Sequence, residues 1–295
     1  MFNKSKGVYF LGLFVYCFMG VSFTQCKQEP IAAPIIDSTQ LGCDYVFDES
    51  SLLLKGWKKS FEDQFNADLN KWNIWNAGAY NNELQLYQSQ NLLLLNGILE
   101  IHAKKEKVSG ATLPNNPALK DFSYSSGRIE SKSSFSANTN NKKVKFIARL
   151  KLPVGYGMWP AFWAYGDPWP TQGEIDFVEA RGSNVFEYLT NYYYGDIPGV
   201  IYQEDNTATI KTVSNLSSCF HVYEMEWSET ELNSYLDGKL VESKKSGKHI
   251  PNLFGKSEHI VLNLAVGGGF FPSYNPALIE TGILYVDWVK VYQFQ

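Results

Sequence analysis

Three carboxylates stand close together in the segment 173–179, which has the sequence GEIDFVE. The residues between the acids are apolar, which is typical of a strand with one packed face. On such a strand Glu174 and Asp176 point to the same side, whereas Glu179 has the opposite parity. One extra residue, inserted as a β-bulge around 177–178, would return Glu179 to that side. The segment therefore predicts a row of three acids along one strand.

Acids crowded in this way differ in pKa, because each ionised group disfavours ionisation of the next. One carboxyl can then stay protonated and act as an acid while another stays ionised. A pair of carboxyls in these two roles is what hydrolysis of a glycosidic bond requires. The alternative is a solvated edge strand, on which the acids would have no common role.

A tryptophan-rich segment, GMWPAFW at 157–163, lies just upstream of the acids. If it is a strand, Trp159, Ala161 and Trp163 share one face. Indoles along a cleft would stack on the apolar faces of pyranose rings, although either tryptophan alone would more often be a core aromatic. Their closeness in sequence to the three acids favours a sugar-binding cleft.

The elements that must position these residues have a period of two, not 3.6. Short strands are predicted over 92–102, 129–135, 145–152, 221–227, 232–237 and 260–266. Asn96-Gly97 and Asp237-Gly238 are hairpin signals, because both residues of such a turn can take positive φ. No long helix or repeat is visible. Many evenly spaced strands predict two packed antiparallel sheets.

The composition agrees with a single all-β domain that has an aromatic cleft. Aromatic residues make up 15% of the 295 residues and charged residues only 19%. The chain that follows an N-terminal leader is long enough for one sizeable core. A net charge of −4 gives no reason to expect a nucleic-acid partner. A local basic cleft for an acidic polysaccharide stays open at this point.

The chain resembles glycoside hydrolase family 16, the group of laminarinases, lichenases, agarases and carrageenases. The segment from Glu174 to Glu179 matches the bulged form of the family signature, acid-x-Asp-x-x-acid, and further matches occur in the expected order at 81–85, 124–129, 148–163 and 285–292. The resemblance implies a β-jelly-roll sandwich whose concave sheet forms the substrate cleft. It implies a catalytic domain over 45–295 with a closing strand at 285–292.

The family pattern implies a role for each acid. Glu174 would be the nucleophile and Glu179 the general acid and base, while Asp176 would hydrogen-bond and tune the nucleophile. Such a retaining reaction needs the two catalytic carboxyls about 5–5.5 Å apart. The resemblance thus implies an endo-acting hydrolase of a β-linked polysaccharide that needs no cofactor for catalysis, and we expect a monomer.

Other residues are candidates for contacts with the polysaccharide. Trp159 and Trp163 would stack near the cleaved bond, and Asn82, Arg128 and Asn191 would supply polar contacts. The alternative for Asn82 is a turn residue, and the alternative for Arg128 is a structural ion pair.

The substrate is not fixed by the acids. Laminarinase-like members commonly have a histidine on the neighbouring strand, where this chain has TNYYY at 190–194 and no histidine between 103 and 220. A β-1,3-glucan or β-1,3-1,4-glucan is the first expectation. A galactan (agar, porphyran or carrageenan) or a host glycan is the alternative, followed by a transglycosylase. A non-catalytic carbohydrate-binding jelly roll is the alternative of a different class, because fold does not fix function.

Asp287 resembles an aspartate that helps to bind a structural calcium in many relatives, a site that would need six or more oxygens in all. The four histidines and the cysteines show no zinc spacing. Cys43 and Cys219 are equally able to form a disulfide in an oxidising compartment or to remain two thiols.

The N-terminus reads as a leader for export. Two lysines precede an uncharged apolar run at 8–23, which is short for a membrane span and typical of a signal peptide over 1–25. Cys26 follows directly, as the lipidated cysteine of a bacterial lipoprotein would, with a tether over 26–44. The alternative is a soluble secreted protein in which Cys26 is incidental. The expected location is the outer membrane, the cell surface or the medium, with the membrane contacted only through that lipid.

Overall fold

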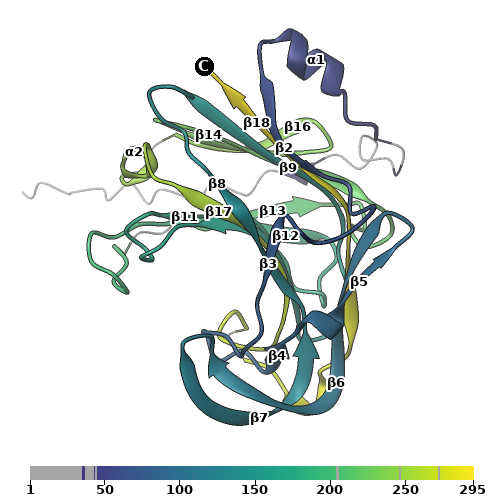
Figure 1. Ribbon diagram of the computed structural model, residues 1–295. Coiled ribbons are helices and arrows are strands. Elements are labelled where there is room, and N and C mark those ends of the chain that lie inside the picture. The colour runs from purple at the N-terminus through teal and green to yellow at the C-terminus, as the bar shows by residue number, and fades with distance from the viewer. Residues whose placement is uncertain (1–34, 37–42, 44, 204–205, 246, 272) are drawn as a thin grey trace, which may run out of the picture. The chain divides into compact units, whose positions relative to one another are not determined.

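The computed structural model describes residues 35–36, 43, 45–203, 206–245, 247–271 and 273–295. These residues form an all-β domain of two facing sheets, as the period of two predicted (Figure 1). The only helices with α geometry in the described ranges are α1 (Glu49–Leu54) and α2 (Ile250–Leu253), and neither has the length or apolar character to cross a membrane. The predicted signal peptide over 1–25, with Cys26, lies outside the described residues.

The first sheet has eight strands and contains the segment with the three acids. Its order is β1-β13-β12-β11-β10-β17-β8-β3. In that order the strands are Ile35–Ile36, Ala208–Thr212, Glu187–Tyr193, Glu174–Glu179, Met158–Tyr165, Glu258–Val266, Arg128–Phe135 and Trp72–Ile74. All neighbours are antiparallel except β1 and β13.

The second sheet has ten strands in the order β16-β15-β14-β9-β18-β6-β7-β4 along its main path. In that order they are Lys239–Lys244, Leu232–Leu236, His221–Ser228, Lys143–Lys151, Gly282–Phe294, Ile98–Leu113, Asn116–Ser126 and Gln85–Tyr87. Beside this path, β2 (Lys58–Asp63) pairs with β18 and β5 (Leu92–Leu95) pairs with β6. The predicted closing strand is therefore β18, which has β9 and β6 as neighbours and lies inside the sheet.

Both predicted hairpin turns are present. Asn96 and Gly97, with φ of 53° and 76°, join β5 to β6, so the expected strand over 92–102 is two strands of one hairpin. Asp237 and Gly238, with φ of 49° and 72°, join β15 to β16. Positive φ at both positions is the geometry that Asn-Gly and Asp-Gly adopt at low cost.

The main core lies between the two sheets and is rich in aromatic contacts. Phe177 of β11 stacks on Phe146 of β9, with ring centroids 4.8 Å apart, and meets Phe162 of β10 edge to face at 4.8 Å. Burial of such a side chain contributes about 1.5–3 kcal/mol. The strand that holds the acids is thus fixed to the opposite sheet through its other face.

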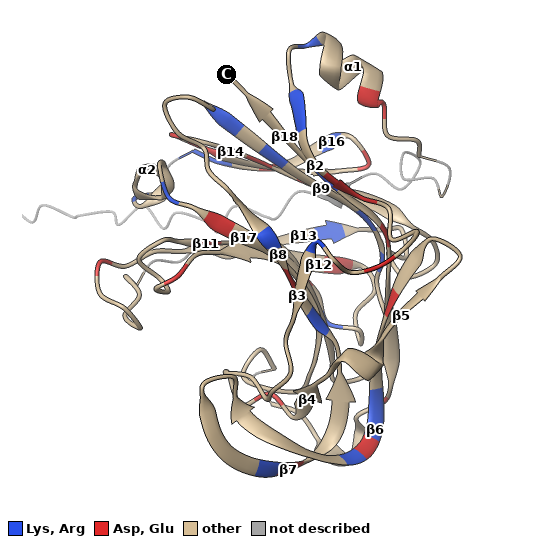
Figure 2. Cartoon of the chain, in the orientation of Figure 1, with Lys and Arg blue, Asp and Glu red and all other residues tan. Residues whose placement is uncertain are grey.

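The N-terminal part of the domain covers the other face of the second sheet. A separate apolar cluster forms there from Tyr45, Phe47, Leu52 and Trp57 with Ile147, Val222, Trp288, Tyr292 and Phe294. Cys43 forms a disulfide with Cys219, Cα to Cα 5.6 Å, which resolves the two alternatives that the sequence left open. Ile35–Ile36, inside the predicted tether, forms β1. Lys and Arg residues are interspersed with Asp and Glu over both sheets (Figure 2).

Candidate active site

β11 contains the predicted bulge. Asp176 pairs with Trp163 of β10 and Glu179 pairs with Ala161, so three steps along β11 match two along β10. The pairing with β12 is irregular over the same residues. The extra residue restores the parity of Glu179, so that Glu174, Asp176 and Glu179 lie on the face of the sheet that holds Trp163.

The opposite face of β11 is anchored in the core. Ile175, Phe177 and Val178 are buried, and two of these apolar residues are consecutive in sequence. Two neighbouring inward side chains are what a bulge produces, because the extra residue repeats the orientation of the one beside it. The strand that holds the acids is therefore fixed by the packing of its opposite face in the core.

Burial and mutual repulsion shape the ionisation of the three acids. Burial, with the charge of Glu179 as the next cause, raises the pKa of Glu174 to about 8, and burial raises the pKa of Glu179 to about 7. Burial and both glutamates hold the pKa of Asp176 well above its usual range. The Asp176 Oδ2 is buried and has no hydrogen-bond partner among the described residues. Burial therefore favours the protonated form of each carboxyl near neutral pH, and the ionised form of Glu174 depends on Trp169 and Arg128, which lower its pKa.

Each glutamate receives a hydrogen bond from a tryptophan. The Trp169 Nε1–H donates to the Glu174 Oε2 (2.6 Å), and the Trp159 Nε1–H donates to the Glu179 Oε1 (3.0 Å). Each bond favours the ionised carboxylate and lowers its pKa against the effect of burial. The ring of Trp159 also stacks on Phe270, with centroids 4.6 Å apart. Trp159 thus orients an acid, and one of its faces is already covered.

Trp163 and Arg128 lie together on the same face of the sheet. The Trp163 Nε1–H donates to the Asn263 Oδ1 (2.7 Å), and the Arg128 guanidinium lies 5.0 Å from the centroid of the Trp163 ring. Arg128 is buried and forms an ion pair with Glu130 (2.6 Å), the alternative weighed for it from the sequence. Its charge nevertheless lowers the pKa of Glu174. Arg128 therefore contributes to the electrostatics of the acids through space.

The two asparagine candidates differ in position. Asn191 is buried on β12, pairs with Asp176 across the strands and donates through its Nδ2 to the Tyr193 Oη (2.8 Å). It is thus brought next to the acids. Asn82 is exposed with φ of 56°, directly after Asn81 with φ of 60°, which is the turn geometry considered for it.

Sequence reasoning missed three residues around the acids. Trp169 lies five positions before Glu174, and no pattern shows that its side chain turns back onto that carboxyl. Tyr193 pairs with Glu174 across β12, and burial together with the charges of all three acids raises its pKa. Strand alternation with Asn191 could have indicated Tyr193. Glu258, the third, stands at the start of an apolar strand and has no distinguishing signal.

Glu258 is a fully buried carboxyl beneath the nucleophile candidate. Both of its oxygens lack a hydrogen-bond partner in the described part of the chain. A Cβ at position 173 would lie 2.7 Å from the Glu258 Oε1, so Gly173, with φ of +88°, makes room for this carboxyl. Burial and the charge of Glu174 raise the pKa of Glu258 well above its usual range. Glu258 is therefore neutral in the folded protein at neutral pH.

We expect Glu258→Gln to stabilise the protein at alkaline pH. The folded state binds a proton on Glu258 that the unfolded state releases above its ordinary pKa, so stability falls as pH rises between the two pKa values. Glutamine removes this penalty, and about 1 kcal/mol corresponds to about 2–4 °C in Tm for a domain of this size. Thermal melts at about pH 8 should show a Tm higher by a few degrees. A gain of the same size at about pH 4, where both states are protonated, would contradict this explanation.

Asp287, the candidate calcium ligand, forms an ion pair with Arg149 (2.6 Å). Within the described ranges, no three His, Cys, Asp or Glu side chains gather as a metal site would require. A cation at Asp287 would share that carboxylate with an arginine and would take its remaining oxygens mainly from backbone carbonyls. Calcium binding by Asp287 stays a prediction.

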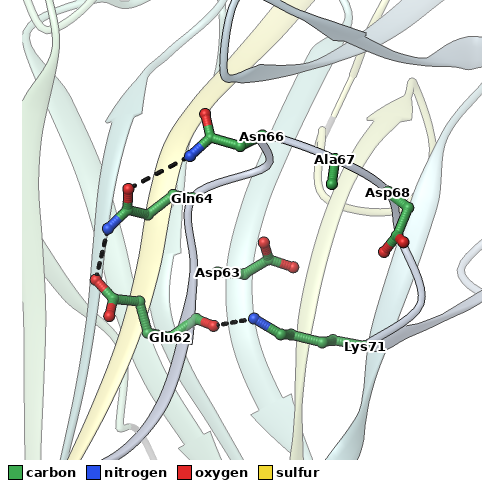
Figure 3. Close-up of a pocket in the computed structure, with 7 residues that line it drawn as sticks. All are labelled: Glu62, Asp63, Gln64, Asn66, Ala67, Asp68 and Lys71. Carbon is green, nitrogen blue, oxygen red and sulfur yellow. Dashed lines mark hydrogen bonds between the residues drawn. The ribbon is translucent and has the colours of Figure 1, made fainter.

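A surface pocket lies at the connection between β2 and β3, away from the predicted site residues (Figure 3). It is lined by Glu62, Asp63, Gln64, Asn66, Ala67, Asp68 and Lys71. Both Asp63 oxygens are already engaged, one by the Phe65 N–H (3.0 Å) and one by the Trp72 indole (2.7 Å). The chemistry of the molecule therefore rests on the row of acids on β11.

Comparison with known families agrees with this geometry. The sequence model of Glycosyl hydrolases family 16 matches residues 71–290, which is most of the chain. The chain belongs to this family. The match spans both sheets and includes all of β11, the strand that holds the three acids.

Individual relatives of this family 16 chain are glucanases. It is 30% identical over 273 residues to glucan endo-1,3-beta-glucosidase A1 of Niallia circulans. This alignment covers 82% of this chain and 39% of that protein. It is 28% identical over 291 residues to a beta-glucanase of Rhodothermus marinus, 87% of this chain and 92% of that protein. The solved laminarinase catalytic domain of Thermotoga maritima superposes with a TM-score of 0.67 at 27% identity, over 81% of this chain and 99% of that domain.

Proposed function

We propose that this family 16 chain is a retaining endo-hydrolase of β-1,3- or β-1,3-1,4-glucan. The observation that supports this most directly is the bulged strand β11, which aligns a buried Asp176 with two partly buried glutamates and gives each glutamate its own indole donor. The glucanase relatives support the substrate class, although this chain spans only about two fifths of the Niallia circulans protein.

In the first step, the ionised Glu174 attacks the anomeric carbon. The bond from that carbon to the leaving oxygen breaks, and Glu179 transfers its proton to this oxygen, so that a glycosyl-enzyme ester and a shortened polysaccharide form. The Trp169 N–H keeps the Glu174 carboxylate in place. A protonated Asp176 beside it removes one negative charge, which makes ionisation of Glu174 easier.

In the second step, a water molecule hydrolyses the ester. Glu179, now ionised, accepts a proton from the water, and the resulting hydroxyl bonds to the anomeric carbon while the Glu174 carboxylate leaves. The Trp159 N–H stabilises Glu179 in this ionised form. Two inversions at the same carbon leave the β configuration retained.

A galactan is the second candidate substrate because of the residue that lies beside Glu174, which is Tyr193. Tyr193 and Asn191 of β12 pair with Glu174 and Asp176, where laminarinase-like members commonly have a histidine. The part of the cleft nearest the cleaved bond is therefore built from a phenol and an amide. Both groups hydrogen-bond sugar hydroxyls and do not distinguish a glucosyl from a galactosyl ring by charge.

A substrate panel tests the proposal. Release of reducing ends is measured from laminarin, lichenan, agarose, porphyran and carrageenan, and the first product is examined by NMR for the β anomer. We expect cleavage of laminarin or lichenan with retention, and none by Glu174→Gln. Cleavage of a galactan alone would select the second candidate. Binding without any cleavage would leave a carbohydrate-binding jelly roll, and products longer than the substrate would identify a transglycosylase.

We expect Trp159→Phe to move the alkaline limb of the activity profile to higher pH. Glu179 must be protonated in the first step, so activity falls as pH rises through its pKa. Loss of the indole N–H removes a bond that lowers this pKa. A hydrogen bond to a charged group contributes about 1.5–3 kcal/mol, which corresponds to a shift of about one to two pH units. The profile of kcat/KM against pH measures the shift.

Trp163→Phe is the matched control for this variant. Its indole donates to Asn263 instead of a carboxylate, so the alkaline limb should stay where it is in the wild type, whatever happens to the rate. If both variants moved the limb equally, or if Trp159→Phe moved it to lower pH, the hydrogen bond to Glu179 would not be its cause.

We also propose that the protein is exported and held at the membrane through a lipid on Cys26. The charged and apolar pattern of 1–25 and the position of Cys26 support this. In cells given a fatty-acid label, the wild type should incorporate it and sediment with membranes, and Cys26→Ser should do neither. Unlabelled, soluble wild-type protein would favour simple secretion.

A further inference from the structure

The loop that follows β12 has an exposed apolar surface with no part in the reaction described above. Ile197, Val200 and Tyr202 are 62%, 53% and 41% exposed, and an isolated bridge between Ile197 and Val200 turns the chain between them. Single exposed apolar residues are ordinary. Here three exposed apolar residues lie within six positions, on a loop that is hydrogen-bonded to Trp169 of the active site. Such a cluster is typical of a surface that binds a ligand.

Tyr202 is held in one orientation. Its ring stacks on the imidazole of His249, with centroids 4.6 Å apart and planes 14° from parallel, and lies 6.1 Å from the ring of Tyr194. Its N–H donates to the Tyr194 carbonyl oxygen (2.8 Å), and its hydroxyl donates to Asp196. The Tyr202 ring is therefore already ordered, so its side chain loses little conformational entropy when a ligand contacts it.

The same loop is connected to the nucleophile candidate. The Gly199 N–H donates to the Trp169 carbonyl oxygen (2.8 Å), and the Trp169 indole donates to Glu174 (2.6 Å). On the other side, the Asn206 Nδ2 donates to the Tyr192 carbonyl oxygen of β12 (3.2 Å). The loop thus borders the end of β11 at which Glu174 stands.

The chemistry of the loop suits a neutral sugar. A flat aromatic ring beside aliphatic groups packs on the apolar face of a pyranose. Both oxygens of the neighbouring Asp196 already accept hydrogen bonds, from Tyr194 and Tyr202, so the aromatic and aliphatic groups make the main contact. Hydrogen bonds from Tyr202 and Tyr194 lower the pKa of Asp196, so its exposed carboxylate is negative. The Lys256 ammonium, 5.7 Å from the centroid of the Tyr194 ring, offsets this charge, so the loop favours a neutral sugar over an anionic or a cationic one.

We propose that Tyr202, with Ile197 and Val200, forms an outer subsite that binds a neutral pyranose of the polysaccharide beyond the sugars that contact the three acids. This inference rests on the proposed function, because it assigns one more ring of the same chain to this loop. The subsite makes the enzyme favour long chains over short ones.

Tyr202→Ala tests the subsite, with a long β-1,3-glucan and a β-1,3-linked trisaccharide as substrates. A stacking contact of about 1.4 kcal/mol corresponds to tenfold in affinity. We therefore expect kcat/KM for the long glucan to fall about tenfold through KM, and kcat/KM for the trisaccharide to change less than about twofold. Tyr202→Phe keeps the ring and should restore most of the long-glucan activity.

Leu54→Ala is the control, since Leu54 is an exposed apolar residue of α1 on the far side of the second sheet. It should leave both substrates unaffected. An unchanged KM for the long glucan in Tyr202→Ala, or equal losses on both substrates, would overturn the subsite while leaving hydrolysis intact. If the wild type cleaved no glucan, the proposed function would fail, and retardation of wild type but not Tyr202→Ala in laminarin-containing gels would still decide the subsite.

Discussion

Glu174→Gln is expected to lower kcat by about 10⁴-fold or more, because loss of the nucleophile closes the covalent route. Glutamine preserves the size of the side chain, and its amide oxygen can still accept the hydrogen bond from the Trp169 indole. Initial rates on the preferred glucan measure the effect. Near wild-type turnover would show that another group attacks the anomeric carbon.

Glu179→Gln should lower turnover by about 10²–10⁴-fold, the usual contribution of a general acid. Azide separates the two roles on an aryl glycoside with a good leaving group. With Glu179→Ala, azide should attack the glycosyl-enzyme and give a β-glycosyl azide. With Glu174→Ala, it should attack the substrate directly and give the α-glycosyl azide. The opposite pairing of variants and anomers would reverse the assignment of the two acids.

Neither substitution should unfold the domain. The two carboxyls are partly buried, and burial disfavours their ionised forms, so a neutral amide removes a cost instead of a stabilising contact. Tm should therefore be equal to or above that of the wild type. A lower Tm with lost activity would attribute the loss to misfolding, and the azide products would then be absent as well.

Deletion of β18, by a stop codon after Thr281, is expected to abolish folding. The deletion removes the strand between β9 and β6 together with the partner of β2. Leu284, Val286, Val289 and Val291 are fully buried. At about 1.5–3 kcal/mol each, their loss alone equals about 6–12 kcal/mol, which is comparable with the whole stability of a typical domain.

Near-ultraviolet circular dichroism and thermal melts measure this effect. The truncated chain should lack a cooperative transition and accumulate as aggregate, since the exposed edges of β9 and β6 offer unpaired backbone groups. Removal of Gln295 alone, which lies beyond the end of β18, is the control and should leave the melt unchanged. A truncated chain that melted cooperatively near the wild-type Tm would show that β18 is dispensable.

Much of this architecture could be predicted because it depends on local patterns. Alternation along short segments indicates strands, and Asn96-Gly97 indicates a hairpin through its own backbone preference. The bulge was predictable for the same reason, since the parity of Glu179 is visible in the sequence itself. The need for one protonated and one ionised carboxyl is a prediction from the same alignment, whereas the assignment of these roles to Glu174 and Glu179 comes from the resemblance to family 16 and stays a prediction.

The remaining features depend on which distant segments meet. Trp169 is close to Glu174 in sequence, but the direction of its indole is set by the fold of a loop. The disulfide required Cys43 to approach Cys219 from 176 positions away. Glu258 gives no sequence signal, because the burial of a single acid at the start of a strand depends on which distant residues pack over it.

The bulge in β11 also links the spacing of Glu174 and Glu179 to the packing between the two sheets. Phe177, the extra residue, spans the gap between the two sheets and touches Phe146 on the far one. A change of volume at this contact, such as Phe146→Leu, would tilt the strand and alter the gap between Glu174 and Glu179, without touching either. The spacing of Glu174 and Glu179 can thus be changed from the interior, by repacking of aromatic rings, while the side chains that face the substrate stay the same.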